Sequence, residues 1–121
     1  MAKRVLAADD SASVRQVVSY VLGGAGYEVI LAVDGKDALG KLDAGPVQMI
    51  MTDLNMPTLD GLALIKAVRA SPTHRLTPIL MVTTESADGK KQQGKAAGAT
   101  GWIVKPFTPD QLLAVVRKLI G

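Results

Sequence analysis

The 121-residue chain has no cysteine, a single histidine and few aromatic residues, and each scarcity excludes a class of protein. Without cysteine, disulfides and thiolate metal sites are ruled out, which is typical of a reducing compartment. His74 stands alone, so we expect neither a histidine-based zinc site nor a Ser-His-Asp triad. Aromatic residues make up 3%, so the core must consist of aliphatic side chains and methionine, and a hydrophobic share of 48% is enough to build it.

Long hydrophobic runs are also missing. None approaches the roughly 20 residues that a membrane-spanning helix needs. The chain enters a strand-like segment within a few residues of Met1, so we expect no signal peptide. We therefore predict a cytoplasmic protein without membrane insertion, and the length fits one domain over residues 1–121.

The formal net charge is +3, but the charges are unevenly distributed. Residues 86–121 carry six Lys or Arg against Asp88 and Asp110, whereas acidic residues gather at Asp9, Asp10 and Asp53. Either the basic residues are solvated helix faces, or they form a surface that favours an acidic partner or nucleic acid. We expect no nucleic-acid binding, because the predicted domain leaves no residues for a DNA-binding effector.

Short apolar runs alternate with segments of helical periodicity. The predicted strands are residues 5–8, 29–31, 47–52, 78–82 and 103–104. The predicted helices start at Ser11 or Ser13, Asp34, Asp60, residue 87 and Thr108. This alternation predicts an α/β domain with a parallel sheet and right-handed crossovers.

Polar residues follow four of the five predicted strands. Asp9-Asp10 follow the first strand, Asp53 the third, Thr83-Thr84 the fourth and Lys105-Pro106 the fifth. The carboxyl ends of parallel strands meet at one edge of a sheet, so these side chains should converge there.

Three carboxylates at one edge repel one another unless a cation shares the site. Without cysteine or histidine ligands, Mg²⁺ suits such an oxygen site best, with Mn²⁺ as the alternative. Taken singly, Asp9, Asp10 and Asp53 could instead be helix caps or turn residues, and Lys105 could be solvated. Their coincidence on successive strand ends favours a site for a divalent metal and a phosphoryl group.

Four segments carry a family resemblance, and together they span essentially the whole chain. They are residues 5–10, Asp53-Leu54-Asn55-Met56-Pro57 with Asp60-Gly61, Met81-Val82-Thr83, and Lys105-Pro106-Phe107. They resemble the receiver domains of bacterial two-component response regulators, and most closely the single-domain, CheY-like chemotaxis regulators. The resemblance implies a doubly wound, flavodoxin-like sheet of five parallel strands in the order 2-1-3-4-5, flanked by five helices.

The resemblance also implies a role for each matching residue. Asp53 would be the phosphoacceptor, and Lys105 would pair with Asp53 and later with the phosphoryl oxygens. Mg²⁺ would be held by the carboxylates of Asp10 and Asp53, by the backbone carbonyl of Asn55, and by Asp9 either directly or through water.

Further roles concern the switch and its reset. Thr83 and Trp102 would form the switch, and the alternative for Trp102 is a surface-anchored core residue. Asn55 and Glu85 occupy positions that tune self-dephosphorylation in the family.

The partners implied are a histidine kinase of the CheA type, a downstream protein on the face formed by the fourth helix, fifth strand and fifth helix, and a phosphatase. We expect a monomer that is not an enzyme beyond its own Mg-dependent phosphorylation and slow autodephosphorylation. A chemotaxis regulator is the first interpretation, and a phosphate sink or an adaptor in another phosphorelay is the alternative.

A small phosphatase of the haloacid dehalogenase type is less consistent with the sequence. Such enzymes need a second Asp where Asn55 stands, and they carry the nucleophile on the first strand. A flavodoxin-like flavin site fails because Asp9-Asp10 would repel the phosphate.

Overall fold

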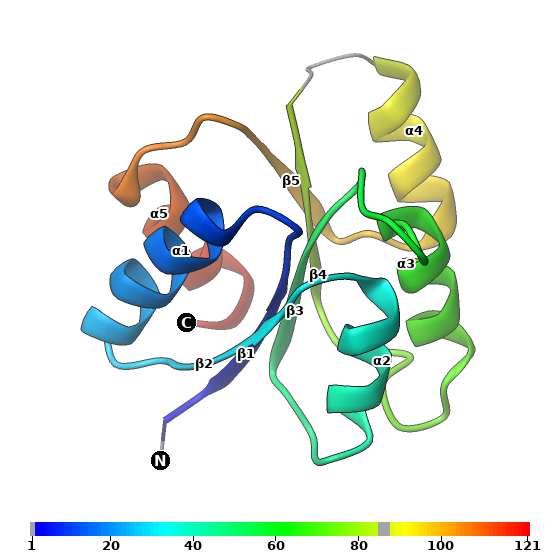
Figure 1. Cartoon of the computed structure of the whole chain (residues 1–121), viewed down its shortest axis with the longest axis horizontal. Helices are drawn as coiled ribbons and strands as arrows, with labels where there is room; N and C mark the ends of the chain where they lie inside the picture. The colour runs from blue at the N-terminus through cyan, green and yellow to red at the C-terminus, as the bar shows by residue number, and fades with distance from the viewer. Residues whose placement is uncertain (1, 85–87) are drawn as a thin grey trace.

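The computed structural model describes residues 2–84 and 88–121, which form five strands alternating with five helices (Figure 1). The strands are β1 (Arg4–Ala8), β2 (Glu28–Ala32), β3 (Met49–Asp53), β4 (Ile79–Thr83) and β5 (Gly101–Val104). The helices are α1 (Ala12–Gly24), α2 (Gly35–Leu42), α3 (Gly61–Ala70), α4 (Asp88–Ala97) and α5 (Pro109–Ile120).

All five strands are parallel and pair in the order β2-β1-β3-β4-β5. The predicted fold class and strand order are therefore confirmed. Strands β1 and β3 lie side by side in the middle of the sheet, with Ala8 of β1 opposite Thr52 of β3. This register brings the residues that follow both strands to the same edge.

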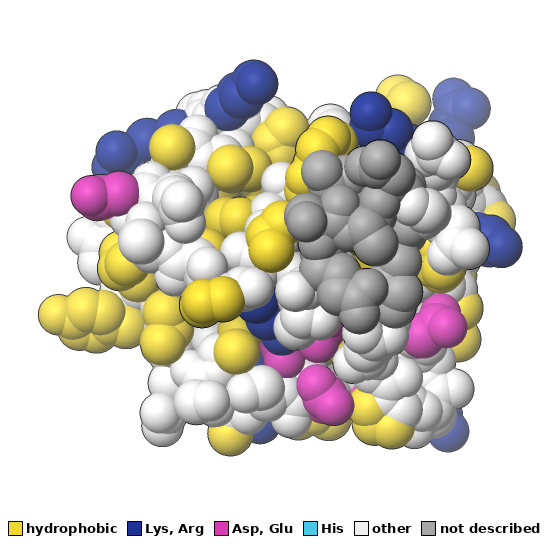
Figure 2. Space-filling view, turned by 90° about the horizontal axis from the view of Figure 1, so that it is seen from above, with side chains coloured by type: hydrophobic (Ala, Val, Ile, Leu, Met, Phe, Trp, Pro, Cys, Tyr) yellow, Lys and Arg dark blue, Asp and Glu magenta, His cyan; other side chains and the backbone are white. Residues whose placement is uncertain are grey.

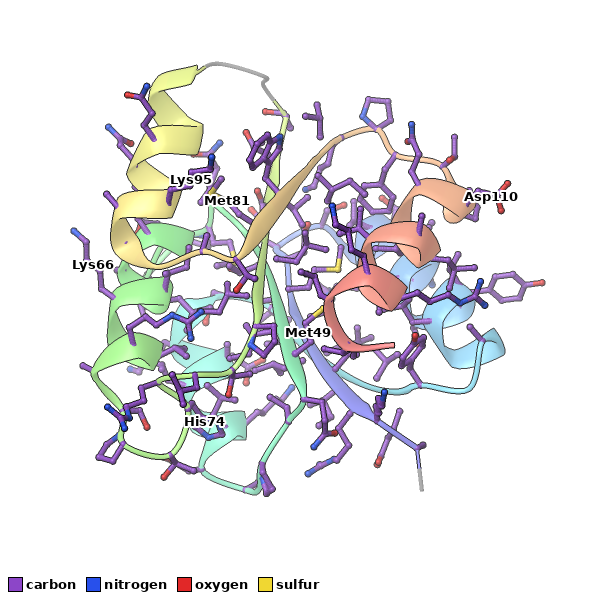
Figure 3. All side chains as sticks on the ribbon, turned by 180° about the vertical axis from the view of Figure 1, so that it is seen from behind. Met49, Lys66, His74, Met81, Lys95 and Asp110 are labelled. Carbon is purple, nitrogen blue, oxygen red and sulfur yellow. The ribbon has the colours of Figure 1, made fainter. Side chains whose placement is uncertain are left out.

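Helices cover both faces of the sheet. Figure 1 shows α1 and α5 on one side and α2, α3 and α4 on the other. Each face has its own apolar cluster: Met49 belongs to the α1–α5 side and Met81 to the opposite side, as their labels in Figure 3 indicate. Strands covered on both faces need nearly continuous apolar residues, and every residue of β3 and β4 is buried.

Short polar side chains begin four of the helices. Ser11, Asp34, Asp60 and Thr108 each accept a hydrogen bond from a backbone N–H in the first turn of α1, α2, α3 and α5. Such caps satisfy donors that would otherwise lack partners. The alternative that the sequence left open is thereby resolved, because Ser11 caps α1.

Helix α4 approaches the sheet closely at a glycine. An added Cβ on Gly94 would lie 2.0 Å from Sδ of Met81, a fully buried side chain of β4. The sequence indicates only a polar helix weakened by glycine. In the structure Gly94 allows the close approach of α4 to β4.

Strand boundaries differ slightly from the sequence prediction. The apolar run at residues 47–52 predicted the third strand, which instead spans Met49–Asp53. Asp53 is therefore the last residue of the strand and is fixed by the sheet.

None of the helices within residues 2–84 and 88–121 combines the length and hydropathy that crossing a bilayer would require.

Candidate functional site

Three carboxylates meet at the carboxyl edge of the central strands. Asp9 and Asp10 follow β1, and Asp53 ends β3. One oxygen of each carboxylate lies within 4.8 Å of the others. Figure 2 looks onto this edge and shows acidic side chains gathered near the middle of the face beside a basic one. The predicted convergence of these three residues is therefore observed.

Lys105, which follows β5, supplies the positive charge at this cluster. Its Nζ lies 2.7 Å from Oδ2 of Asp9 and 3.2 Å from Oδ2 of Asp53. All three side chains are largely buried, with Lys105 14% exposed and both carboxylates 7% exposed. The sequence suggested the pairing with Asp53, but it did not indicate that Asp9 is the closer partner.

The pKa of Lys105 reflects two opposing effects. Burial alone would lower the pKa of the ammonium group, but the hydrogen bond and charge of Asp9, followed by those of Asp53, raise it above the ordinary lysine value. Lys105 is therefore a permanent cation at neutral pH. Its backbone N–H donates to the carbonyl of Thr83 at 2.7 Å, which ties the residue to the end of β4.

The surroundings of Asp9 fix the position of its carboxylate. The backbone N–H of Ser11 donates to Oδ1 of Asp9 at 2.9 Å, while Oδ2 faces Lys105. Nη1 of Arg15 donates to the backbone carbonyl of Asp9 at 2.7 Å. No sequence pattern singled out Arg15, because its contact depends on how α1 lies against the end of β1.

Asp53 is positioned by its own turn and by the helix that follows. The backbone N–H of Asn55 donates to Oδ1 of Asp53 at 3.3 Å. A Cβ on Gly61, the first residue of α3, would lie 2.2 Å from the backbone oxygen of Asp53. Only glycine allows this approach, so Gly61 packs directly against the backbone that carries Asp53.

The other predicted site residues lie on β4 and β5. Thr83 is buried at the end of β4, and its neighbour Val82 pairs in register with Asp53. Trp102 is partly exposed on β5, opposite Met81, and packs against the apolar cluster on the α3–α4 side. Glu85 lies outside the residues that the structure describes.

The donor set suits a divalent ion with oxygen ligands. Among the described residues, Lys105 forms the two ion pairs of this cluster, one with Asp9 and one with Asp53. Three carboxylates and one ammonium leave two net negative charges, which one divalent cation balances. Carboxylate oxygens from a compact cluster fit Mg²⁺, which retains waters that phosphate oxygens can replace.

Two grooves adjoin this site. One of about 550 Å³ lies between α1 and the segment after β5 and is lined by Ser13, Val14, Val17, Thr84, Lys105, Pro106 and Phe107. The other, of about 570 Å³, lies between β5 and α5 and is lined by Trp102, Ile103, Val104, Lys105, Pro106, Gln111, Ala114 and Val115. Lys105 lines both grooves.

Comparison with known proteins gives consistent matches over the whole chain. Residues 5–117 match the family model described as the response regulator receiver domain. A relative named chemotaxis protein CheY1, from Helicobacter pylori strain J99, is 38% identical over 120 residues that cover 98% of this chain and 97% of that protein.

Solved structures give the same result. The chemotaxis response regulator CheY4 of Vibrio cholerae is 50% identical, with a TM-score of 0.95 over 98% of this chain and 99% of that one. The receiver domain of the sensor histidine kinase PA1611 from Pseudomonas aeruginosa is 26% identical, with a TM-score of 0.92 over 100% and 99% of the two chains. The latter is described as having a magnesium ion coordinated in its active site cleft.

Proposed function

The chain belongs to the response regulator receiver domain family, and from this premise we propose that it is a stand-alone chemotaxis response regulator phosphorylated on Asp53 by a histidine kinase. The observation that carries the proposal is the position of Lys105, whose Nζ contacts both Asp9 and Asp53 beside a third carboxylate. This arrangement gives Asp53 both a phosphate-binding cation and the ligands for a metal.

The transfer follows from these positions. An oxygen of the Asp53 carboxylate attacks the phosphorus of a phosphohistidine, the P–N bond breaks, and the departing imidazole takes up a proton. Asp9, Asp10, Asp53 and the carbonyl of Asn55 would hold Mg²⁺, which would neutralise charge on the transferred group. Lys105, already 3.2 Å from Asp53, turns its hydrogen bond to the phosphoryl oxygens.

The groove between α1 and the segment after β5 gives the donor a route to the site. Its walls include the apolar side chains of Val14, Val17 and Phe107 together with Lys105. A surface helix of a kinase that carries the phosphohistidine can approach Asp53 from this side. The small phosphodonor acetyl phosphate can enter the same way.

The output is a change in partner binding. A phosphoryl group on Asp53 draws the Thr83 hydroxyl toward it, and Trp102 then moves inward. The face of α4, β5 and α5 changes shape as a result, and the groove between β5 and α5 supports a protein target there. Moving the active population from about 1% to 99% takes roughly 5.5 kcal/mol of differential stabilisation, so a bound target contributes to full activation.

Asn55 and Glu85 set the rate at which water removes the phosphoryl group. The protein is a switch that resets slowly, aided by a phosphatase, and we expect no turnover of small phosphomonoesters.

A phosphate sink or an adaptor uses the same receiver chemistry. A pull-down that compares beryllofluoride-activated protein with Asp53→Ala distinguishes these outputs by the partner captured.

Intact-protein mass spectrometry tests the phosphoacceptor. We expect the wild-type protein to gain one phosphoryl group with acetyl phosphate and Mg²⁺, and to gain none when EDTA replaces Mg²⁺. Asp53→Asn should gain none under either condition, because an amide oxygen does not form the acyl phosphate.

Asp110→Asn is the matched control, since Asp110 lies at the start of α5 (Figure 3) and is not one of the clustered carboxylates. It should be phosphorylated as the wild type is. A phosphoryl group on Asp53→Asn, or a wild-type protein modified equally well without Mg²⁺, would contradict the proposal.

A further inference from the structure

A lysine on α4 contacts the predicted switch tryptophan. Nζ of Lys95 lies 5.1 Å from the centroid of the Trp102 ring. An ammonium group within about 6 Å of an aromatic face is attracted by its quadrupole, and tryptophan is the strongest such partner. Lys95 is exposed, so its charge is hydrated on one side and meets the indole on the other.

The residue before Lys95 lies close against the sheet. Gly94 lies so close to Met81 that a Cβ there would meet the sulfur at 2.0 Å. Met81 and Trp102 are opposite each other on β4 and β5. Two successive residues of α4 therefore meet two paired residues of the sheet, and Figure 3 labels Lys95 and Met81 beside each other.

The same face of the sheet also carries Thr83. Side chains two residues apart on a strand point to the same face, so Thr83 lies on the face of Met81 and Trp102. When Thr83 moves toward a phosphoryl group, the space it leaves opens on that face. A tryptophan that moves into this space moves away from Lys95.

Resting on the proposed function, we propose that Lys95 is a positioning residue that holds Trp102 in its unphosphorylated conformation through this cation–π contact. The contact has to be broken before Trp102 moves inward. It therefore opposes activation and raises the amount of activator that the protein needs. At a partly exposed site, such a contact changes a conformational equilibrium by about two- to five-fold.

Fluorescence of Trp102, the single tryptophan of the chain, tests this role. Lys95→Met keeps most of the aliphatic stem and removes the charge, whereas Lys95→Arg keeps a cation over the ring. Lys36→Met, on an exposed position of α2, is the control for loss of one positive charge. Each protein is titrated with beryllofluoride at saturating Mg²⁺, and the emission of Trp102 is recorded.

We expect Lys95→Met to reach half-maximal response at a beryllofluoride concentration about two- to five-fold lower than the wild type. Lys95→Arg and Lys36→Met should retain the wild-type midpoint. The emission spectrum of metal-free Lys95→Met should also differ from that of Lys95→Arg, because only the latter keeps a cation at position 95.

An unchanged or higher midpoint for Lys95→Met would overturn the proposal, and so would a Lys95→Arg variant that behaves like Lys95→Met. Urea unfolding of all four proteins shows whether a changed midpoint merely follows lost stability. If the wild type itself does not respond to beryllofluoride, the proposed function fails. If instead the wild type responds and Lys95→Met has the same midpoint, the proposed function stands and only the role of Lys95 fails.

Discussion

At the scale of single residues, Lys105 sets the charge balance of the site. Its ammonium group faces Asp9 and Asp53, and all three are largely buried. Removing one member of a buried ion pair leaves the opposite charge uncompensated, which costs more than the pair itself contributes. The stability of the metal-free protein therefore depends on Lys105.

Lys105→Met is expected to lower the free energy of unfolding in EDTA by about 1–3 kcal/mol, because two carboxylates lose their cation. Millimolar Mg²⁺ should restore part of this loss, and it should bind the variant more tightly since a like charge is gone. Urea unfolding with and without Mg²⁺ measures both effects. Lys118→Met, an exposed site on α5, is the control, and equal losses in EDTA and Mg²⁺ would show that Lys105 acts through packing alone.

Which residues approach the site could be predicted from the sequence, but not how they contact one another. Asp9, Asp10, Asp53 and Lys105 follow strands, and parallel strands share a carboxyl edge, so their convergence follows from the pattern. The shorter contact of Lys105 with Asp9 depends on how the chain after β5 crosses the sheet edge. Gly61 likewise reads as a helix start, and its contact with the Asp53 backbone is visible only in three dimensions.

At the scale of the elements, α4 is where sequence propensity and packing disagree. Its composition is polar and includes Gly94, which disfavours a helix. The close contact of Gly94 with Met81 explains the residue, because α4 lies near the sheet there only if no side chain intervenes. Helical propensity alone does not reveal such a constraint, whereas the apolar stripes of α1 and α5 predicted those helices directly.

Gly94→Ala should therefore destabilise the protein by about 1–3 kcal/mol, despite the higher helix propensity of alanine, because the new methyl group overlaps the buried side chain of Met81. Gly40→Ala in α2 is the matched control. No atom lies within 4 Å of a Cβ placed on Gly40, so this change should stabilise by about 0.5–1 kcal/mol. Chemical denaturation of both variants checks the opposite signs, and a stabilised Gly94→Ala would refute the packing argument.

Helix α2 contains a group that links stability to pH. The backbone N–H of Val33 donates to Asp37 at 3.0 Å and holds the pKa of this carboxyl below its ordinary value; burial opposes the shift and Lys41, 3.2 Å away, adds to it. A carboxyl whose pKa is lower in the folded state stabilises the protein above its unfolded pKa. That contribution is lost as the pH falls through the folded value.

Asp37→Asn should lower stability at pH 7 by about 0.5–1 kcal/mol, a value reduced for the partial exposure of the carboxylate. The difference from the wild type should begin to shrink as the pH falls below about 4, the pKa of the unfolded state, and should disappear only as the pH passes through the lower pKa of the folded state. Urea unfolding of both proteins between about pH 3 and pH 7 measures it. A difference that stays constant over this range would show that the charge of Asp37 has no part in it.

At the scale of the whole molecule, the acidic cluster couples metal binding to folding. The unfolded chain does not hold Asp9, Asp10 and Asp53 together, so an ion that binds them stabilises the folded state. At 100 times its dissociation constant, Mg²⁺ would add about 2.7 kcal/mol to the free energy of unfolding.

In Asp10→Asn, the Mg²⁺ concentration needed for a given stabilisation should rise at least about ten-fold. The metal-free variant should be more stable than the metal-free wild type, because one of three like charges is removed. Thermal unfolding of both proteins across an Mg²⁺ titration tests both expectations. A wild-type transition temperature that does not respond to millimolar Mg²⁺ would contradict the metal site itself.

The order of the site residues along the chain has a consequence for protein synthesis. Asp9, Asp10 and Asp53 come from the first half of the chain, and Lys105 lies 52 residues after Asp53. Strands β1 and β3 pair directly, so a nascent chain can bring the three acids together before the ribosome has made residue 105. Until that segment emerges, cations of the surrounding solution have to neutralise the cluster. At a synthesis rate of about 5–20 residues per second, the proposed magnesium site would therefore need a counter-ion within the first seconds of the chain's existence, while the domain is half made.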